Sequence, residues 1–224
     1  MFEELKSAFL EMAKLYSPIV REDIIGTVSY LLDEAINDEL DTTNLSFLDS
    51  GAYKMAFNDV PGLVFKLVED DTEILNKEET IYNLANEQEL SNFFLPTTFI
   101  RLPRCIKAYK ESEGCDIYFS AIMIQPEVVV SKAEEDNIKT LEKMLPYEFF
   151  HILKNTGLRD SKWIKRLIEV NGQDTFLTFL DFCERYHIYD LHNSNIGYLQ
   201  DRPVIFDWLS DEGDYYDESN DYSI

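Results

Sequence analysis

The period of the hydrophobic pattern changes along the chain, and this change constrains the fold more than any other feature. Short apolar runs separated by turn residues dominate residues 44–68 and 97–125, a pattern typical of antiparallel β-strands. Apolar residues at helical spacing dominate residues 72–90 and most of the chain beyond Gln125-Pro126. A strand-rich part with one helix therefore precedes a mainly helical part. The sequence predicts an α+β fold with a cleft between the two parts.

The individual elements follow from the same patterns. Residues 44–57 predict two strands around a turn at 49–51, and a second turn at 58–62 leads into a third strand at 63–68. Further strands are expected at 97–109, 116–125, 196–199 and 203–206. Helices are expected at 2–16, 22–39, 72–90, 132–144, 146–155, 160–169 and 173–186. The last residues are acidic and poor in aliphatic side chains, which indicates a tail that lies on the surface or is disordered.

The formal net charge of −23 at pH 7 limits the classes of partner. A protein that binds nucleic acid directly needs basic residues to displace counterions from the phosphates, so we do not expect that activity. Two explanations of the charge stay open. The acidic residues form a solvated surface that favours solubility, or they form a surface that mimics nucleic acid or docks on a basic protein.

The remaining composition favours a cytoplasmic protein. No apolar run approaches the roughly 18 residues that a bilayer span needs, and the amphipathic first residues contain acids, unlike a signal peptide. Cys105, Cys115 and Cys183 are odd in number and follow no metal-ligand spacing. They are expected to be reduced thiols, and no membrane partner is expected.

Three oxygen-bearing side chains near the end of the chain suggest a chemistry. Asp190 and Asn195 lie at the ends of Asp190-Leu191-His192-Asn193-Ser194-Asn195, and Asp207 follows the apolar run Val204-Ile205-Phe206. Phosphoryl transfer uses one carboxylate to orient the attacking hydroxyl and hard oxygen ligands to hold Mg²⁺ against the phosphates. An isolated Asp and Asn at this spacing are more often turn or capping residues. The interpretation therefore rests on all three together, and His192 is not taken as a metal ligand.

These segments resemble the protein-kinase-like superfamily, and especially its small-molecule branch of aminoglycoside and choline kinases. The family's Asp-Leu-His-x-x-Asn loop matches residues 190–195, and its metal-binding Ile-Asp-Trp or Ile-Asp-Phe matches Phe206-Asp207-Trp208. The resemblance implies Asp190 as the catalytic residue, Asn195 and Asp207 as metal ligands, and ATP and Mg²⁺ as cofactors. It implies a bilobal protein-kinase-like fold with an N-terminal helical extension at 1–43, an antiparallel-sheet N-lobe at 44–125, a short, mainly helical C-lobe at 126–210 and an acidic tail at 211–224.

The resemblance also assigns nucleotide-binding roles in the first half of the chain. Kinase-like proteins pair a lysine on the third strand with a glutamate on the following helix, and Lys66 lies in the expected third strand. Glu79 is the expected partner, with Glu78 as the alternative, because a helix turns about 100° per residue and only one of them can point at Lys66. Gly51 lies where the family has its phosphate-covering loop, and Gln125 lies at the expected hinge that meets adenine.

The resemblance covers about residues 44–208, and the sequence departs from the family pattern after Asp207 and just before the catalytic loop. Seventeen residues follow Asp207, fewer than an activation segment and its helices need, so a regulated kinase of the eukaryotic type is not expected. His187 is displaced by one residue from the family's His-x-Asp position. Compact, divergent and acidic chains of this kind resemble bacteriophage products, which would act in the host cytoplasm.

The function that follows is an ATP- and Mg²⁺-dependent phosphotransferase acting on a hydroxyl of a small molecule or a basic protein. One alternative is a catalytically inactive pseudokinase that serves as an acidic protein-binding or inhibitory module. Others are a nucleotidyltransferase that binds ATP in reverse and a mimic of nucleic acid. The effect of Asp190→Asn separates catalysis from binding, and the mass added to the product separates phosphate from nucleotide transfer.

Overall fold

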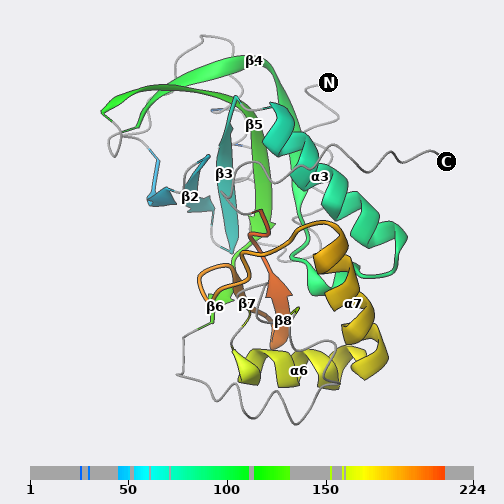
Figure 1. The fold of residues 1–224 in the computed structure, drawn as a ribbon. Helices are drawn as coiled ribbons and strands as arrows, with labels where there is room; N and C mark the ends of the chain where they lie inside the picture. The colour runs from blue at the N-terminus through cyan, green and yellow to red at the C-terminus, as the bar shows by residue number, and fades with distance from the viewer. Residues whose placement is uncertain are drawn as a thin grey trace, which may run out of the picture.

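The fold was analysed in a computed structural model of the chain. The structure describes residues 26, 30, 45–50, 53–60, 62–70, 72–110, 114–131, 152, 158 and 160–209. Within these ranges the fold is α+β, as the sequence predicts. Figure 1 shows a large sheet in the upper half, a small sheet with two helices in the lower half, and one helix beside the large sheet.

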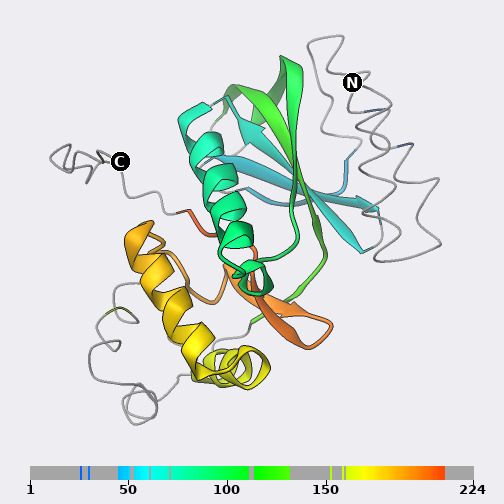
Figure 2. The same cartoon turned by 90° about the vertical axis from the view of Figure 1, so that its right-hand side faces the viewer.

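The large sheet is antiparallel and has the strand order β1-β2-β3-β5-β4. Helix α3 spans Thr72–Glu87 and connects β3 to β4 by way of the short 3₁₀ helix η2 at Ser91–Phe93. Figure 2 shows α3 lying against the sheet. The five strands are β1 (Phe47–Ser50), β2 (Lys54–Val60), β3 (Leu63–Glu69), β4 (Thr98–Lys110) and β5 (Cys115–Pro126).

The register of the β2–β3 hairpin determines what each face of the sheet carries. Ala56 pairs with Lys66 and Lys54 pairs with Val68, and side chains alternate between faces along a strand. One face therefore holds an apolar cluster that includes Met55, Phe57, Leu63, Phe65, Leu67, Ile100, Ile106, Phe119, Ile122 and Ile124. The opposite face packs Val68, Ala121 and Met123 against Leu75 of α3, and it also carries both lysines.

The second part of the fold is built around a three-stranded antiparallel sheet in the order β6-β7-β8. These strands are β6 (Val129–Val130), β7 (Ile196–Leu199) and β8 (Arg202–Ile205). Two helices, α6 (Ser161–Asn171) and α7 (Gln173–Arg185), pack beside them. The side chain of Asp160 accepts the backbone N–H of Trp163 at 2.9 Å and so caps the start of α6.

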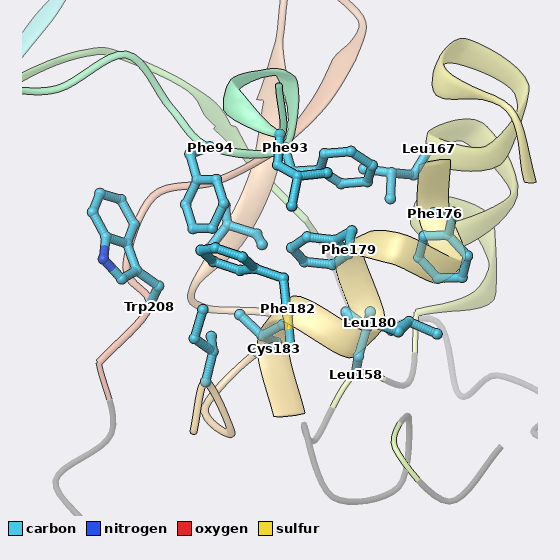
Figure 3. Packing of buried hydrophobic residues seen from close by; sticks show 14 of the residues in the cluster. Phe93, Phe94, Leu158, Leu167, Phe176, Phe179, Leu180, Phe182, Cys183 and Trp208 are labelled. Carbon is cyan, nitrogen blue, oxygen red and sulfur yellow. The ribbon is translucent and has the colours of Figure 1, made fainter. Parts of the chain in front are cut away.

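The largest apolar cluster joins this second part to α3 and η2. Phe93 of η2 stacks on Phe179 of α7 with ring centroids 4.3 Å apart, and the rings of Phe94 and Trp208 lie perpendicular to each other at 5.3 Å. Figure 3 shows these rings in one continuous cluster with Phe182. Ile81 and Ala85 of α3 belong to the same cluster. Packing of this kind fixes α3, α7 and the segment after β8 relative to one another.

Most of the predicted elements within the described ranges are confirmed. Helices α3, α6 and α7 and strands β1–β5, β7 and β8 lie within a few residues of their predicted bounds. Strand β6 and helix η2 were not predicted, because two or three residues carry no periodic signal. Several predicted segments lie outside the described residues: the two N-terminal helices except Gly26 and Tyr30, the helix at 132–144, the helix at 146–155 except Ile152, and the acidic tail. In the described part of the chain no helix is long and apolar enough to cross a membrane.

The pairing of β6 with β7 depends on a glycine. A Cβ atom on Gly197 would stand 2.7 Å from the carbonyl oxygen of Val129, and Val130 pairs directly with Gly197. Replacing Gly197 with alanine should therefore push the two strands apart and lower the free energy of unfolding by about 1–3 kcal/mol. Urea unfolding would measure the loss. Gly26→Ala is the control, because no described residue lies within 4 Å of its Cβ position, and an equal change in both variants would contradict the predicted clash.

Candidate functional site

The segment that carries Asp190 and Asn195 is held by its apolar neighbours. Helix α7 ends at Arg185, and the chain reverses through His187, whose φ is 54°. Ile188 and Leu191 are completely buried in the large apolar cluster. Because these two anchors face the core, the polar side chains between and after them are left at the surface of the loop.

The polar side chains of this loop converge on Asp190. The Nδ2 atom of Asn195 donates to the Oδ2 atom of Asp190 at 3.0 Å and to its backbone oxygen at 2.8 Å. The Nε2 atom of His192 lies 3.2 Å from Oδ1 of Asp190. The side chain of Asp190 retains 36% of its exposure. A fixed and partly exposed carboxylate can accept a hydrogen bond from a hydroxyl group of a bound molecule.

Asp207 is brought to the same loop by backbone contacts. The backbone N–H groups of Phe206 and Asp207 both point at the backbone oxygen of Asn195, at 3.0 and 3.4 Å. The next residue, Trp208, is completely buried and fixes the segment after β8. The three residues that the sequence singled out, Asp190, Asn195 and Asp207, therefore lie together.

Two lysines, one from each strand of the β2–β3 hairpin, approach Asp207. The Nζ atom of Lys54 lies 2.9 Å from Oδ1 of Asp207 and 2.8 Å from Oε1 of Glu78 on α3. The Nζ atom of Lys66 donates to the backbone oxygen of Phe206 at 3.0 Å and lies 3.8 Å from Oδ2 of Asp207. An ion-pair cluster thus joins the large sheet, α3 and the segment after β8.

The predicted pairing of Lys66 with Glu79 is wrong. Glu79 points away from the lysines and pairs with Arg101 at 2.6 Å on the surface. Glu78, the alternative, is completely buried and faces the cluster. The phase of α3 explains this, because Leu75, Glu78 and Ile81 are spaced by three residues on its buried side, and Glu79 is rotated about 100° from Glu78.

Lys54 was missed as a site residue, although it forms the direct ion pair with Glu78. The sequence pattern places Lys54 in the strand that follows the turn at 49–51 and gives it no role. The missing signal was the hairpin register, because Lys54 lies two residues before Ala56, the partner of Lys66. Both lysines must therefore lie on the same face of the sheet.

Burial and charge shift the pKa values of this cluster in different directions. Burial alone would lower the pKa of Lys54, but the carboxylates of Asp207 and Glu78 outweigh it and raise that pKa. Burial lowers the pKa of Lys66, and the charge of Lys54 adds to this effect. Burial would raise the pKa of Asp207, but the two lysines outweigh it and the pKa lies below its ordinary value. Burial raises the pKa of Glu78 against the opposing charge of Lys54. Lys54 and Asp207 are therefore both charged at neutral pH.

Of the two remaining predicted site residues, Gln125 and Gly51, the structure describes only Gln125. Gln125 is buried at the end of β5, and its Nε2 atom donates to Thr97 at 3.0 Å and to the backbone oxygen of Phe206 at 3.1 Å. It shares that oxygen with Lys66, so it supports the segment that carries Asp207. Gly51 lies outside the described residues.

The oxygen atoms of Asn195 and Asp207 suit a hard cation. Asn195 uses its amide nitrogen for Asp190, and no described residue donates to its Oδ1 atom. Magnesium is commonly held by one or two protein oxygens, with phosphates and waters completing its shell. No group of three or more His, Cys, Asp or Glu side chains in the described ranges is arranged to hold a metal ion. An amide and a single carboxylate, completed by a nucleotide, are compatible with that finding.

Comparison with known proteins adds no assignment. No protein-family model matches the chain, and a search of the curated proteins finds no significant match.

Proposed function

We propose that this chain has a protein-kinase-like bilobal fold and transfers a phosphoryl group from Mg·ATP to a hydroxyl acceptor. The observation that carries the proposal is the convergence of Asp190, Asn195 and Asp207 beside a buried lysine–glutamate pair. The first three residues come from the loop after α7 and the end of β8, whereas Lys54 and Glu78 come from the large sheet and α3. Such an arrangement combines the oxygen ligands and the fixed positive charge that phosphoryl transfer needs.

The chain's own residues would divide the chemistry as follows. Asp190 accepts the hydrogen bond of the acceptor hydroxyl, orients its oxygen and takes up its proton as the new O–P bond forms. The bond between the γ-phosphorus and the bridging oxygen breaks, and its electron pair leaves with ADP. One of the two sheltered lysines, Lys54 or Lys66, supplies positive charge beside the phosphates, and Asn195 and Asp207 would hold Mg²⁺. When bound, Mg²⁺ supplies further charge that stabilises the phosphate oxygens. Most of the rate gain would come from positioning and charge.

The test is the thermal stability of the purified chain with Mg·ATP. A ligand that binds only the folded state at about 100 times its dissociation constant adds about 2.7 kcal/mol to the free energy of unfolding. We expect Mg·ATP to raise the melting temperature of the wild type and to leave that of Asp207→Ala unchanged. Asp181→Ala removes an exposed carboxylate on α7, and this matched control should retain the full shift. An unchanged melting temperature of the wild type at millimolar Mg·ATP would contradict the proposal.

A second candidate is a nucleotide-binding scaffold without catalysis. It is favoured by the contacts of Asp190, since His192 and Asn195 engage its two carboxylate oxygens and Lys54 engages Asp207. In this case Mg·ATP would still stabilise the chain, but no phosphate would reach any acceptor. Mass spectrometry of acceptor panels, small-molecule hydroxyls and basic proteins alike, separates the two candidates. An added nucleotide in place of an added phosphate would indicate nucleotidyl transfer.

A further inference from the structure

The two lysines of the site lie on the same face of the sheet and both approach Asp207, but their hydrogen-bond partners differ. Lys54 on β2 and Lys66 on β3 both project from the face of the sheet that packs on α3. Their side chains are 11% and 9% exposed, so both are sheltered from water. The contacts of each lysine determine which of the two can contact a bound nucleotide.

Lys54 is the lysine that is held by a glutamate. Its ammonium group bridges Oε1 of Glu78 and Oδ1 of Asp207 at 2.8 and 2.9 Å. An ammonium group has three N–H donors, and the described residues accept two of them from Lys54. Glu78 is completely buried, and its Oε2 atom has no hydrogen-bond partner among the described residues. A buried carboxylate with a single cationic partner holds that partner strongly.

Lys66 donates its hydrogen bond to the backbone instead, and its contact with Oδ2 of Asp207 is longer, at 3.8 Å. Its ammonium group donates to the backbone oxygen of Phe206 at 3.0 Å and lies 5.5 Å from the centre of the Phe206 ring. Gln125 donates to the same backbone oxygen. These contacts fix the residue immediately before Asp207, and they hold the ammonium group of Lys66 at the backbone of that segment.

We propose that Lys54, and not Lys66, is the phosphate-binding lysine of this site, and that Lys54 competes with the metal ion for Asp207. Lys66 is a positioning residue that holds the segment carrying Asp207. This inference rests on the proposed binding of Mg·ATP. In the ligand-free chain Lys54 neutralises Asp207 through Oδ1, and this ion pair has to open before both carboxylate oxygens of Asp207 are available to a metal ion.

Charge explains why Lys54 would change partners rather than leave the site. A divalent cation at Asp207 repels an ammonium group that touches the same carboxylate. Glu78 keeps its hold on Lys54 at the other side, because leaving that carboxylate buried without a cation is costly. A phosphate oxygen of the nucleotide then replaces Asp207 as the second acceptor of Lys54. Nucleotide and metal would therefore bind together more readily than the metal alone.

The test compares Lys54→Met with Lys66→Met, two replacements of similar size. Without nucleotide, Mn²⁺ serves as the probe, and its binding is followed by electron paramagnetic resonance. We expect Lys54→Met to bind Mn²⁺ more tightly than the wild type, because the competing cation is gone. The same variant should bind Mg·ATP about tenfold or more weakly, the size of one lost charge-assisted hydrogen bond, with less than about threefold loss in Lys66→Met.

The outcomes separate this inference from the proposed function. Absence of Mg·ATP binding in the wild type would overturn both. Binding by the wild type that Lys66→Met abolishes and Lys54→Met retains would overturn only the assignment of Lys54. Weaker or unchanged Mn²⁺ binding in Lys54→Met would overturn the competition. Because Lys54→Met leaves Glu78 buried without its cation, Lys54→Met/Glu78→Gln is measured as well. The double variant should reproduce both shifts.

Discussion

Replacing Asp190 with asparagine is expected to lower the rate of the proposed phosphoryl transfer by about 10²–10⁴-fold, the range in which a positioned proton acceptor contributes. The change is nearly isosteric. The side-chain oxygen of the new asparagine can still accept the hydrogen bond that Asn195 donates to Asp190 in the wild type. The amide cannot take a proton from an acceptor hydroxyl, so the chemical step is slowed while the structure of the loop is kept. Phosphate transfer to the best acceptor in the panel, measured at saturating Mg·ATP, gives the rate.

Binding and stability provide the controls for this variant. Asp190 retains 36% of its side-chain exposure and lies outside the apolar core, so the melting temperature of Asp190→Asn should match that of the wild type. The upward shift with Mg·ATP should also persist, and Asp181→Asn on α7 should retain the full transfer rate. Wild-type transfer by a folded Asp190→Asn would remove Asp190 from the mechanism. A wild type that binds Mg·ATP but transfers nothing would favour the scaffold function.

The sequence predicted the loop side of the site better than the lysine side. Asp190, Asn195 and Asp207 could be predicted because they lie close together in the sequence. The short segments between them leave few ways to place the three side chains. The lysine–glutamate pair depends on tertiary register. Glu78 could have been chosen over Glu79 from the phase of α3 alone, since it shares a stripe with Leu75 and Ile81. Lys54 required the exact pairing of β2 with β3, and a one-residue slip would have placed it on the other face.

The elements of the fold followed from periodicity where they were long enough to show it. Helix α3 and strands β4 and β5 each cover 12 or more residues, and the sequence predicted all of them. Strand β6 has two residues and exists only because β7 offers it a partner. The contact of Phe94 with β8 is likewise a long-range pairing that no local pattern encodes. Sequence patterns therefore predict which segments form helices and strands. The site also depends on the register in which the strands pair, which local patterns do not encode.

Replacing Trp208 with alanine is expected to lower the free energy of unfolding by about 3–5 kcal/mol, the usual cost of deleting a buried aromatic side chain. Trp208 is completely buried. Its ring stacks on Tyr82 of α3 at 5.8 Å and lies perpendicular to the ring of Phe94 at 5.3 Å, and Figure 3 shows it beside Phe94. Its Nε1 atom points at the backbone oxygen of Glu78 at 3.4 Å. Urea unfolding measures the loss, and Val170→Ala, at a 44% exposed position on α6, is the control.

The same tryptophan connects stability to the site, because it follows Asp207 directly and contacts the residue that holds Lys54. Trp208→Phe retains an aromatic ring but loses the hydrogen bond to Glu78, so it should cost less stability than alanine and leave a folded protein. In that folded protein the segment carrying Asp207 is less firmly placed relative to α3. The upward shift of the melting temperature with Mg·ATP should therefore shrink in Trp208→Phe. A full shift in Trp208→Phe would show that β8, Lys66 and Gln125 alone suffice to position Asp207.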